Sequence, residues 1–230
     1  PRLRLFCFPY VGGGTQIFRE WPNGLGEEIE VWAVQLPGRE RRMAEAPIAN
    51  IAVLADRAVA GLTPLLTGPY AFFGHSMGAI VSFEVARRLR VRPPAALVVS
   101  ANSAPQLTHP RQFLRHRLSD AELIEEIARL DGTPPEVLEH KELLELMLPV
   151  VRADYEAVET YAYTPAAPLT CRLVAYGGTQ DVHIPPDHIE AWREQTSGAF
   201  RAHMFADGHF FLNTRRAELL AELQRDLAAL

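Results

Sequence analysis

The stretch that decides the fold is PYAFFGHSMGAIVSFEVARRLR, from Pro69 to Arg90. Its apolar start predicts a buried strand, and apolar residues at helical spacing in its second half predict a helix. Between the two lies Gly74-His75-Ser76-Met77-Gly78, the Gly-x-Ser-x-Gly pattern of a sharp strand-to-helix turn. The glycines fit because side chains at those positions would collide where strand and helix cross. Such a turn exposes its serine hydroxyl, so Ser76 is the candidate nucleophile.

Composition sets the broad class of the protein. The 230 residues are 48% hydrophobic and 22% charged, which is typical of one globular unit. No apolar run has the length of a membrane span, and no signal-like segment opens the sequence. The net charge of −5 argues against nucleic acid as a partner. Cys7 and Cys171 both fall in predicted strands, which indicates buried reduced thiols and a cytoplasmic protein.

A glycine-rich loop follows the first predicted strand, Leu3 to Phe8. The loop, Tyr10 to Gly14, fails as a dinucleotide fingerprint because Ile17 stands where the third glycine should be. It fails as a phosphate-binding Walker loop because it lacks Gly-Lys-Ser/Thr. Two interpretations remain: a plain tight turn, or a loop that brings a backbone N–H to an oxyanion.

Strands and helices then alternate as far as residue 105. Glu30 to Leu36 and Ala95 to Ser100 are predicted strands, and Ile51 to Leu66 is a predicted helix. This alternation is typical of a parallel sheet covered on both faces. The cluster Arg39-Glu40-Arg41-Arg42 after the Pro37-Gly38 turn is either solvated surface or a site that docks a partner or anchors a loop.

The alternation stops in residues 106–165, where only helices are predicted. A capping box at Ser119 begins one, Thr133 begins a second, and a third runs from Glu142 to Tyr161 with a kink or restart near Pro149. We expect a helical lid inserted in a core of residues 1–105 and 166–230. Six apolar residues of the third helix could line an acyl pocket or simply pack against the core: Leu143, Leu144, Leu146, Met147, Val150 and Val151.

Two further candidates for catalysis follow the last two predicted strands. Asp181 comes just after Cys171 to Tyr176, and His209 comes after Phe200 to Phe205, before a helix from Ala217 to Leu227. A carboxylate and a histidine in these places can reach each other at the carboxyl edge of the sheet. Asp207 is a rival acid, but it stands too close to His209 in sequence to orient the ring easily. No spacing resembles a metal site, and no metal or cofactor is expected.

These residues form a serine-hydrolase constellation. Ser76, Asp181 and His209 occur in the chain order of α/β-hydrolases. His209 would take the serine proton, and Asp181 would fix the tautomer of the histidine and stabilise the imidazolium. The backbone N–H groups of Met77 and Val11 are the expected oxyanion donors.

Four motifs together resemble type II thioesterases, the stand-alone editing hydrolases of polyketide and nonribosomal peptide pathways. They are Phe8-Pro9-Tyr10-Val11-Gly12-Gly13, Gln35-Leu36-Pro37-Gly38-Arg39-Glu40, the serine pentapeptide at residues 74–78, and Gly208-His209-Phe210-Phe211-Leu212. The resemblance implies an α/β-hydrolase fold with a mobile helical lid. It also implies hydrolysis of aberrant or stalled acyl groups from the phosphopantetheine arm of carrier proteins, through an acyl-serine intermediate. Val11 and Asp207 stand where the family more often has alanine and glycine, and neither change removes a catalytic group.

The leading hypothesis is therefore an editing thioesterase that acts, as a monomer, on acyl or peptidyl carrier proteins. The alternatives are a small-ester carboxylesterase with the same triad and, less favoured, a non-catalytic hydrolase-like binding module. A basic cluster at the lid, Arg111, Arg115, His116 and Arg117, is a candidate docking site for acidic carrier proteins.

Overall fold

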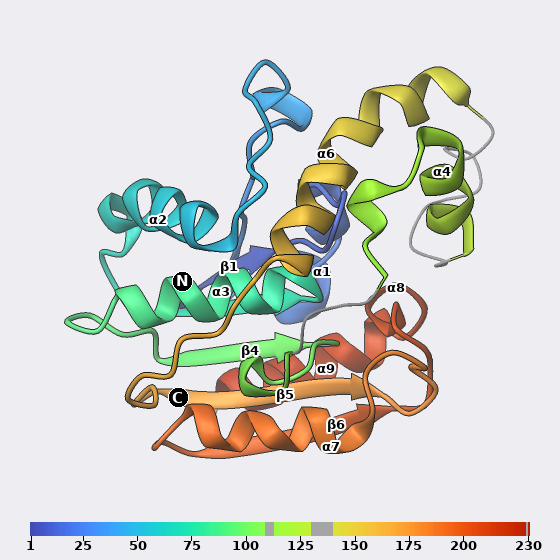
Figure 1. The fold of residues 1–230 in the computed structure, drawn as a ribbon. Helices are drawn as coiled ribbons and strands as arrows, with labels where there is room; N and C mark the ends of the chain where they lie inside the picture. Colours follow the sequence, from blue (N-terminus) through green and yellow to red (C-terminus); the bar gives the residue numbers. More distant parts are fainter. Residues whose placement is uncertain (109–112, 130–139, 229) are drawn as a thin grey trace.

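A six-stranded parallel sheet forms the centre of the molecule (Figure 1). The structure, a computed structural model, describes residues 1–108, 113–129, 140–228 and 230. The strand order is β2-β1-β3-β4-β5-β6, and every neighbouring pair is parallel. The strands are β1 (Leu3–Phe8), β2 (Ile29–Ala33), β3 (Tyr70–His75), β4 (Ala96–Ser100), β5 (Arg172–Gly178) and β6 (Phe200–Phe205). The predicted parallel sheet is thus confirmed, with β2 ending earlier than the sequence suggests because its partner β1 stops before Pro9.

Helices cover both faces of the sheet. The described α-helices are α1 (Pro22–Leu25), α2 (Ile51–Leu62), α3 (Met77–Arg88), α4 (Asp120–Arg129), α6 (Lys141–Glu159), α7 (Pro186–Glu190), α8 (Phe211–Thr214) and α9 (Arg216–Ala228). Short 3-10 helices lie at Thr15–Phe18, Glu40–Arg42, Thr63–Leu65, Pro105–Leu107, Arg115–Arg117 and Ala191–Gln195. Local sequence explains several of these ends. Asn50 caps α2 by accepting a hydrogen bond from the Val53 N–H at 3.1 Å, for example.

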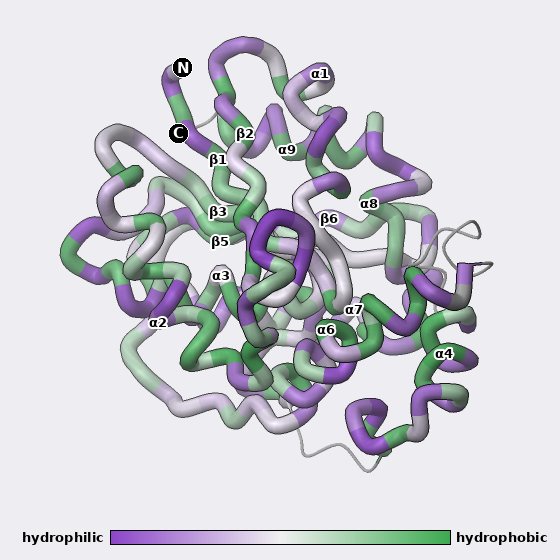
Figure 2. Tube along the Cα trace, turned by 90° about the horizontal axis from the view of Figure 1, so that it is seen from above, coloured by the Kyte–Doolittle hydropathy of each residue, from purple (hydrophilic) through white to green (hydrophobic). Residues whose placement is uncertain are grey.

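Two hydrophobic cores result, one on each side of the sheet. One packs alternate strand residues such as Phe72 against α2, α3 and the Trp192 ring. The other packs their neighbours, such as Phe73, against Trp21 and the apolar side of α9. Viewed from above, hydrophobic residues line the central strands and hydrophilic ones recur around the periphery (Figure 2). Side chains on both faces of β3 are therefore buried, as the continuous apolar run Tyr70 to Phe73 predicts.

The segment 106–165, which we call the helical insertion, carries α4 and α6 above one end of the sheet (Figure 1). Ser119 and Glu122 form the predicted capping box, because each accepts a hydrogen bond from the backbone N–H of the other. The predicted helix at Thr133 lies outside the described residues. Of the kink or restart predicted near Pro149, the restart is wrong, since α6 continues through that proline as one helix; the kink stays a prediction.

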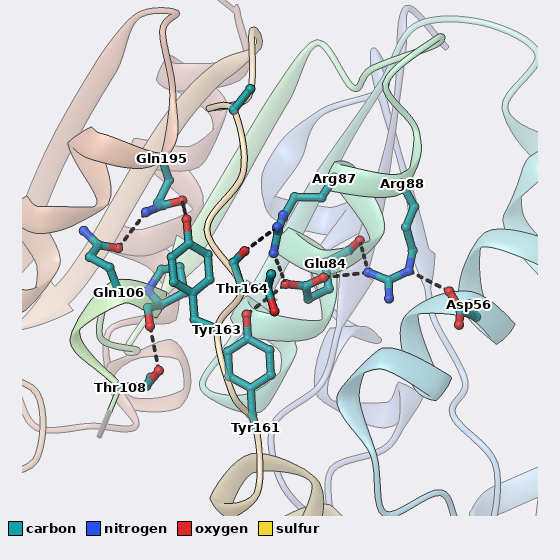
Figure 3. Close-up of polar contacts among 12 residues, drawn as sticks. Asp56, Glu84, Arg87, Arg88, Gln106, Thr108, Tyr161, Tyr163, Thr164 and Gln195 are labelled. Carbon is teal, nitrogen blue, oxygen red and sulfur yellow. Dashed lines mark hydrogen bonds and ion pairs between the residues drawn. The ribbon is translucent and has the colours of Figure 1, made fainter. Parts of the chain in front are cut away.

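Polar contacts fasten the chain that leaves α6 to the core (Figure 3). The buried Glu84 of α3 accepts hydrogen bonds from Arg87, Arg88 and, at 2.8 Å, the Tyr161 hydroxyl. Arg87 also donates to the Thr164 carbonyl at 2.7 Å. The C-terminal end of the insertion is thereby tied to α3, the helix that follows Ser76.

The two ends of the insertion also meet at a single side chain. Gln195 donates to Gln106 Oε1 at 2.7 Å, and its own Oε1 accepts from the Tyr163 hydroxyl at 3.0 Å (Figure 3). Gln106 and Tyr163 stand near the start and the finish of the insertion, so the chain departs from the core and returns to it at one place.

Candidate active site

Ser76 lies at the sharp turn between β3 and α3. Its φ of 54° and ψ of −116° are values that a non-glycine residue rarely adopts. Its N–H donates to the Ser100 carbonyl at 2.8 Å, and its carbonyl accepts from the Asn102 side chain at 2.7 Å. Both contacts come from the end of β4 or just beyond it. The neighbouring strand therefore holds the turn in its strained shape.

Two glycines allow this turn to form. A Cβ at Gly74 would lie 2.0 Å from the Gly78 carbonyl oxygen, and a Cβ at Gly78 would lie 2.2 Å from the Phe8 carbonyl oxygen. Both obstacles are backbone atoms, which have little freedom to move aside. The spacing of glycines around Ser76 thus reflects direct backbone contact between α3 and strands β1 and β3.

Ser76, His209 and Asp181 form a hydrogen-bonded chain. The Asp181 Oδ2 lies 2.6 Å from His209 Nδ1, and His209 Nε2 lies 3.1 Å from Ser76 Oγ. Because an ionised carboxylate can only accept, Nδ1 carries the proton, and Nε2 is left to accept from the serine hydroxyl. This arrangement can remove the hydroxyl proton during attack on a carbonyl carbon.

The environment of Asp181 keeps its carboxylate ionised. Burial raises the pKa of Asp181, but the hydrogen bond and charge of His209 and the N–H groups of His183 and Ile184 outweigh it, so the net pKa is lowered. The rival, Asp207, points elsewhere. Its carboxylate accepts from the Gly208 N–H, the Thr214 hydroxyl and Arg215.

His75, the residue before Ser76, is buried beside the ring of His209. Its ring is fully buried, and Nδ1 lies 2.9 Å from the Ser100 hydroxyl oxygen. Burial holds the pKa of His75 well below 6.5, so the ring is neutral. It contacts the ring of His209 edge-on, with centroids 5.5 Å apart. His75 therefore packs against the ring of His209.

The two backbone N–H groups predicted to stabilise an oxyanion belong to two different elements. The Met77 N–H belongs to the first turn of α3, where backbone donors have no acceptor within the helix. Val11 lies in a tight turn that is closed by the Gly13 N–H donating to the Tyr10 carbonyl at 2.9 Å. Gly12 in that turn has φ of +71°, a value that favours glycine.

A buried ion pair that the sequence did not reveal holds this turn. Arg39 donates to both Asp154 oxygens, at 2.9 and 2.8 Å, and to the Gly13 carbonyl at 2.9 Å. The same Asp154 accepts from the Gly12 N–H at 2.8 Å. The partners Arg39 and Asp154 are 115 residues apart, so no spacing in a single sequence links them.

The other three residues of the charged cluster, Glu40, Arg41 and Arg42, differ in their contacts. Glu40 accepts from the Thr15 N–H and hydroxyl, both at 2.8 Å, and so holds the far end of the glycine-rich loop. Arg42 pairs with Glu45, and Arg41 is exposed. Of the interpretations left open, loop anchoring describes Arg39 and Glu40, and solvated surface describes Arg41.

A family model described as a thioesterase domain matches residues 3–227. The chain belongs to the thioesterase family. The gramicidin S biosynthesis protein GrsT of Aneurinibacillus migulanus is 41% identical over 229 residues, covering 98% of this chain and 89% of that protein. Thioesterase PikA5 of Streptomyces venezuelae is 40% identical, covering 98% and 81%.

Solved thioesterase structures have the same fold. RedJ, a thioesterase from the prodiginine pathway of Streptomyces coelicolor, superposes with a TM-score of 0.91 at 41% identity and covers 97% of this chain and 90% of its own. BorB, a type II thioesterase from the borrelidin cluster, gives 0.90 at 39%, covering 97% and 91%. The α/β-hydrolase fold and the assignment as a serine-type thioester hydrolase are thus confirmed.

The apolar residues expected to line an acyl pocket of this thioesterase do not all face inward. Leu144, Val150 and Val151 are buried, whereas Leu143 and Leu146 are about half exposed. A cleft of about 580 Å³ lies elsewhere, between the start of α2, the end of α3 and the chain after α6, and its lining includes no member of the triad. That cleft is therefore separate from the three residues of the candidate site.

The basic cluster of the insertion is largely engaged within the thioesterase itself. Arg115 pairs with Glu126 at 2.7 Å, and His116 Nδ1 lies 2.7 Å from Glu159. Arg117 is exposed, and Arg111 lies outside the described residues. Arg115 and His116 therefore hold the insertion together and are poor candidates for docking.

Neither a metal site nor a membrane-spanning helix is found in the described part of the chain. Among those residues, no three or more His, Cys, Asp or Glu side chains are grouped so that they could hold a metal ion. None of the helices there is both long and apolar enough to cross a bilayer. Cys7 and Cys171 are free and buried, and burial raises the pKa of both thiols.

Proposed function

We propose that this thioesterase releases acyl groups from the phosphopantetheine arm of acyl or peptidyl carrier proteins, with Ser76 as nucleophile, His209 as base and Asp181 as the acid that orients it. The observation that carries the proposal is the unbroken hydrogen-bonded chain from Asp181 to the Ser76 hydroxyl. The relatives point to the substrate, because GrsT is named for gramicidin S biosynthesis, RedJ for the prodiginine pathway and the type II thioesterase BorB for the borrelidin cluster.

The reaction divides into two steps. His209 takes the proton of Ser76 as Oγ attacks the thioester carbonyl, and the N–H groups of Met77 and Val11 stabilise the oxyanion. Collapse expels the pantetheine thiol, which takes a proton from His209, and leaves an acyl-serine. Water, deprotonated by His209, then attacks the acyl-serine carbonyl; as the bond to Ser76 Oγ breaks, His209 returns the proton to that oxygen and the carboxylic acid is released.

The test compares turnover of an acyl-pantetheine with that of the matching p-nitrophenyl ester. We expect kcat/KM to favour the thioester, and a preference for the free ester would support a carboxylesterase instead. A fluorophosphonate should label the wild type and leave Ser76→Ala unlabelled. Labelling that persists in Ser76→Ala would show that another residue is the nucleophile, and an unlabelled wild type would favour a binding module.

We propose further that the helical insertion acts as a lid over Ser76 and that the protein works as a monomer.

Charge reversal at the exposed Arg117 tests whether a carrier protein docks on the insertion. If the variant turns over carrier-bound acyl groups more slowly than the wild type but turns over acyl-pantetheine at the wild-type rate, the carrier docks there. If the variant differs from the wild type by the same factor on both substrates, docking lies elsewhere. Size-exclusion chromatography with light scattering checks the oligomeric state.

A further inference from the structure

The turn that carries the proposed oxyanion donor is held by the helical insertion. Asp154 on α6 accepts the Gly12 N–H at 2.8 Å, one residue after Val11. The Val11–Gly12 peptide is planar, so fixing its N–H also fixes the Val11 carbonyl and Cα. The Gly13 to Tyr10 hydrogen bond restrains the other side of the turn. The direction of the Val11 N–H is therefore set from both ends.

Apolar contacts from α6 reach the same turn. A Cβ at Gly12 would lie 2.8 Å from Val151 Cγ2, which shows that α6 packs directly on the loop backbone. The Val11 side chain packs against an apolar cluster within the insertion: Leu123, Ile127, Leu148 and Val151. The glycine-rich loop thus contacts α6 through both a buried carboxylate and side-chain packing.

Arg39 holds the carboxylate in place from the core side. The side chains of Arg39 and Asp154 are 7% and 1% exposed, so water competes little for their hydrogen bonds. Arg39 also donates to the Gly13 carbonyl, which joins the loop, the core and α6 in one network. An apolar pair of similar volume can often replace a buried ion pair without loss of stability. Such a pair would offer no acceptor to the Gly12 N–H.

We propose that Asp154, which Arg39 holds in place, is a positioning residue for the oxyanion hole. The Val11 N–H is then correctly directed only when α6 is packed on the core. The inference rests on the proposed roles of Ser76 and Val11. A consequence is that a displaced insertion leaves Ser76 with its base but with a misaligned donor. Hydrolysis is then suppressed until α6 seats over the site.

The test uses the double variant Arg39→Met with Asp154→Leu, which removes both charges together and leaves neither one buried alone. We expect kcat on acyl-pantetheine to fall by about ten- to a hundred-fold, less than the roughly 10²–10³-fold that follows removal of a whole donor. KM and the pH profile should stay the same, because the oxyanion forms only in the transition state. Affinity for a trifluoromethyl ketone analogue should fall by the same factor as kcat.

The matched control is Asp120→Asn. It breaks a different ion pair of the insertion, between Asp120 and Arg152 at 2.5 Å, and Asp120 is 73% exposed. Its kcat should equal that of the wild type. A double variant with wild-type kcat, or one whose loss lies entirely in KM, would overturn the proposal. Turnover that survives in Ser76→Ala would instead refute the proposed function.

A measurement on the wild type keeps the inference testable if the double variant unfolds. Amide hydrogen exchange followed by NMR should show the Gly12 N–H protected, with an exchange rate that follows that of amides in α6. Exchange at Gly12 as fast as in an exposed loop would show that Asp154 does not hold the turn, and would count against the proposal.

Discussion

Replacement of Gly78 by alanine should damage both stability and catalysis through one backbone contact. The added Cβ would lie 2.2 Å from the Phe8 carbonyl oxygen and 2.8 Å from that of Pro9, where ordinary contact begins at 3.4 Å. Helix α3 would have to move away from β1 by about 1 Å to restore contact, because neither obstacle is a flexible side chain. The Met77 N–H, one residue earlier, would move with it.

The magnitude follows from these distances. Overpacking typically costs 1–3 kcal/mol, and rigid backbone on both sides places Gly78→Ala near about 3 kcal/mol. For a chain of this length that corresponds to a fall in Tm of about 6–12 °C. A displacement of about 1 Å in the catalytic geometry should lower kcat by roughly 10²-fold.

Calorimetry and turnover of acyl-pantetheine measure the two effects, and Gly61→Ala is the matched control. Gly61 lies near the end of α2 with nothing within 4 Å of its added Cβ. Its replacement should raise stability by about 0.5–1 kcal/mol and leave kcat unchanged. If Gly78→Ala behaved like Gly61→Ala, the reasoning that backbone contact fixes the turn at Ser76 would be refuted.

Three further predictions concern titratable groups. Burial keeps the pKa of His75 well below 6.5, so the free energy of unfolding is highest above that pH and falls below it, by up to about 1.4 kcal/mol per pH unit. In urea denaturation between pH 7 and 5, His75→Gln should make the free energy of unfolding less dependent on pH than in the wild type. An equal pH dependence in both proteins would contradict this role of His75. Asp181→Asn should lower kcat by about 10⁴-fold while folding is retained, because the tautomer of His209 is no longer fixed; steady-state kinetics with circular dichroism checks this, and a loss below tenfold would refute the role of Asp181. Asp207→Asn should leave kcat unchanged, since its carboxylate bonds to Gly208, Thr214 and Arg215; a large loss in the same assay would make it the acid.

The features that the sequence predicts correctly are those that neighbouring residues decide. The apolar run before Ser76, the glycines around it and the capping box at Ser119 each depend on neighbours within a few residues. The α/β-hydrolase fold and the three residues that meet at the candidate site followed from such signals and from their order along the chain.

Contacts between distant segments could not be predicted in this way. Nothing near Arg39 shows that its partner is Asp154 on α6, and nothing near His116 shows that it pairs with Glu159. The end of β2 depends on where β1 stops. The inward or outward direction of Leu143 and Leu144 depends on how α6 lies against the core. Each of these depends on tertiary packing, which hydrophobic periodicity alone does not specify.

Gln106 and Tyr163, near the two ends of the insertion, both hydrogen-bond to Gln195, so the insertion could be exchanged as a unit. Because the chain leaves and rejoins the core at one point, a short linker could close the gap at a small entropic cost. Insertions from relatives with other acyl preferences could be grafted at the same junction, provided that the graft supplies a carboxylate where Asp154 stands. Substrate range could then be re-engineered while the core that carries Ser76 and His209 is kept whole.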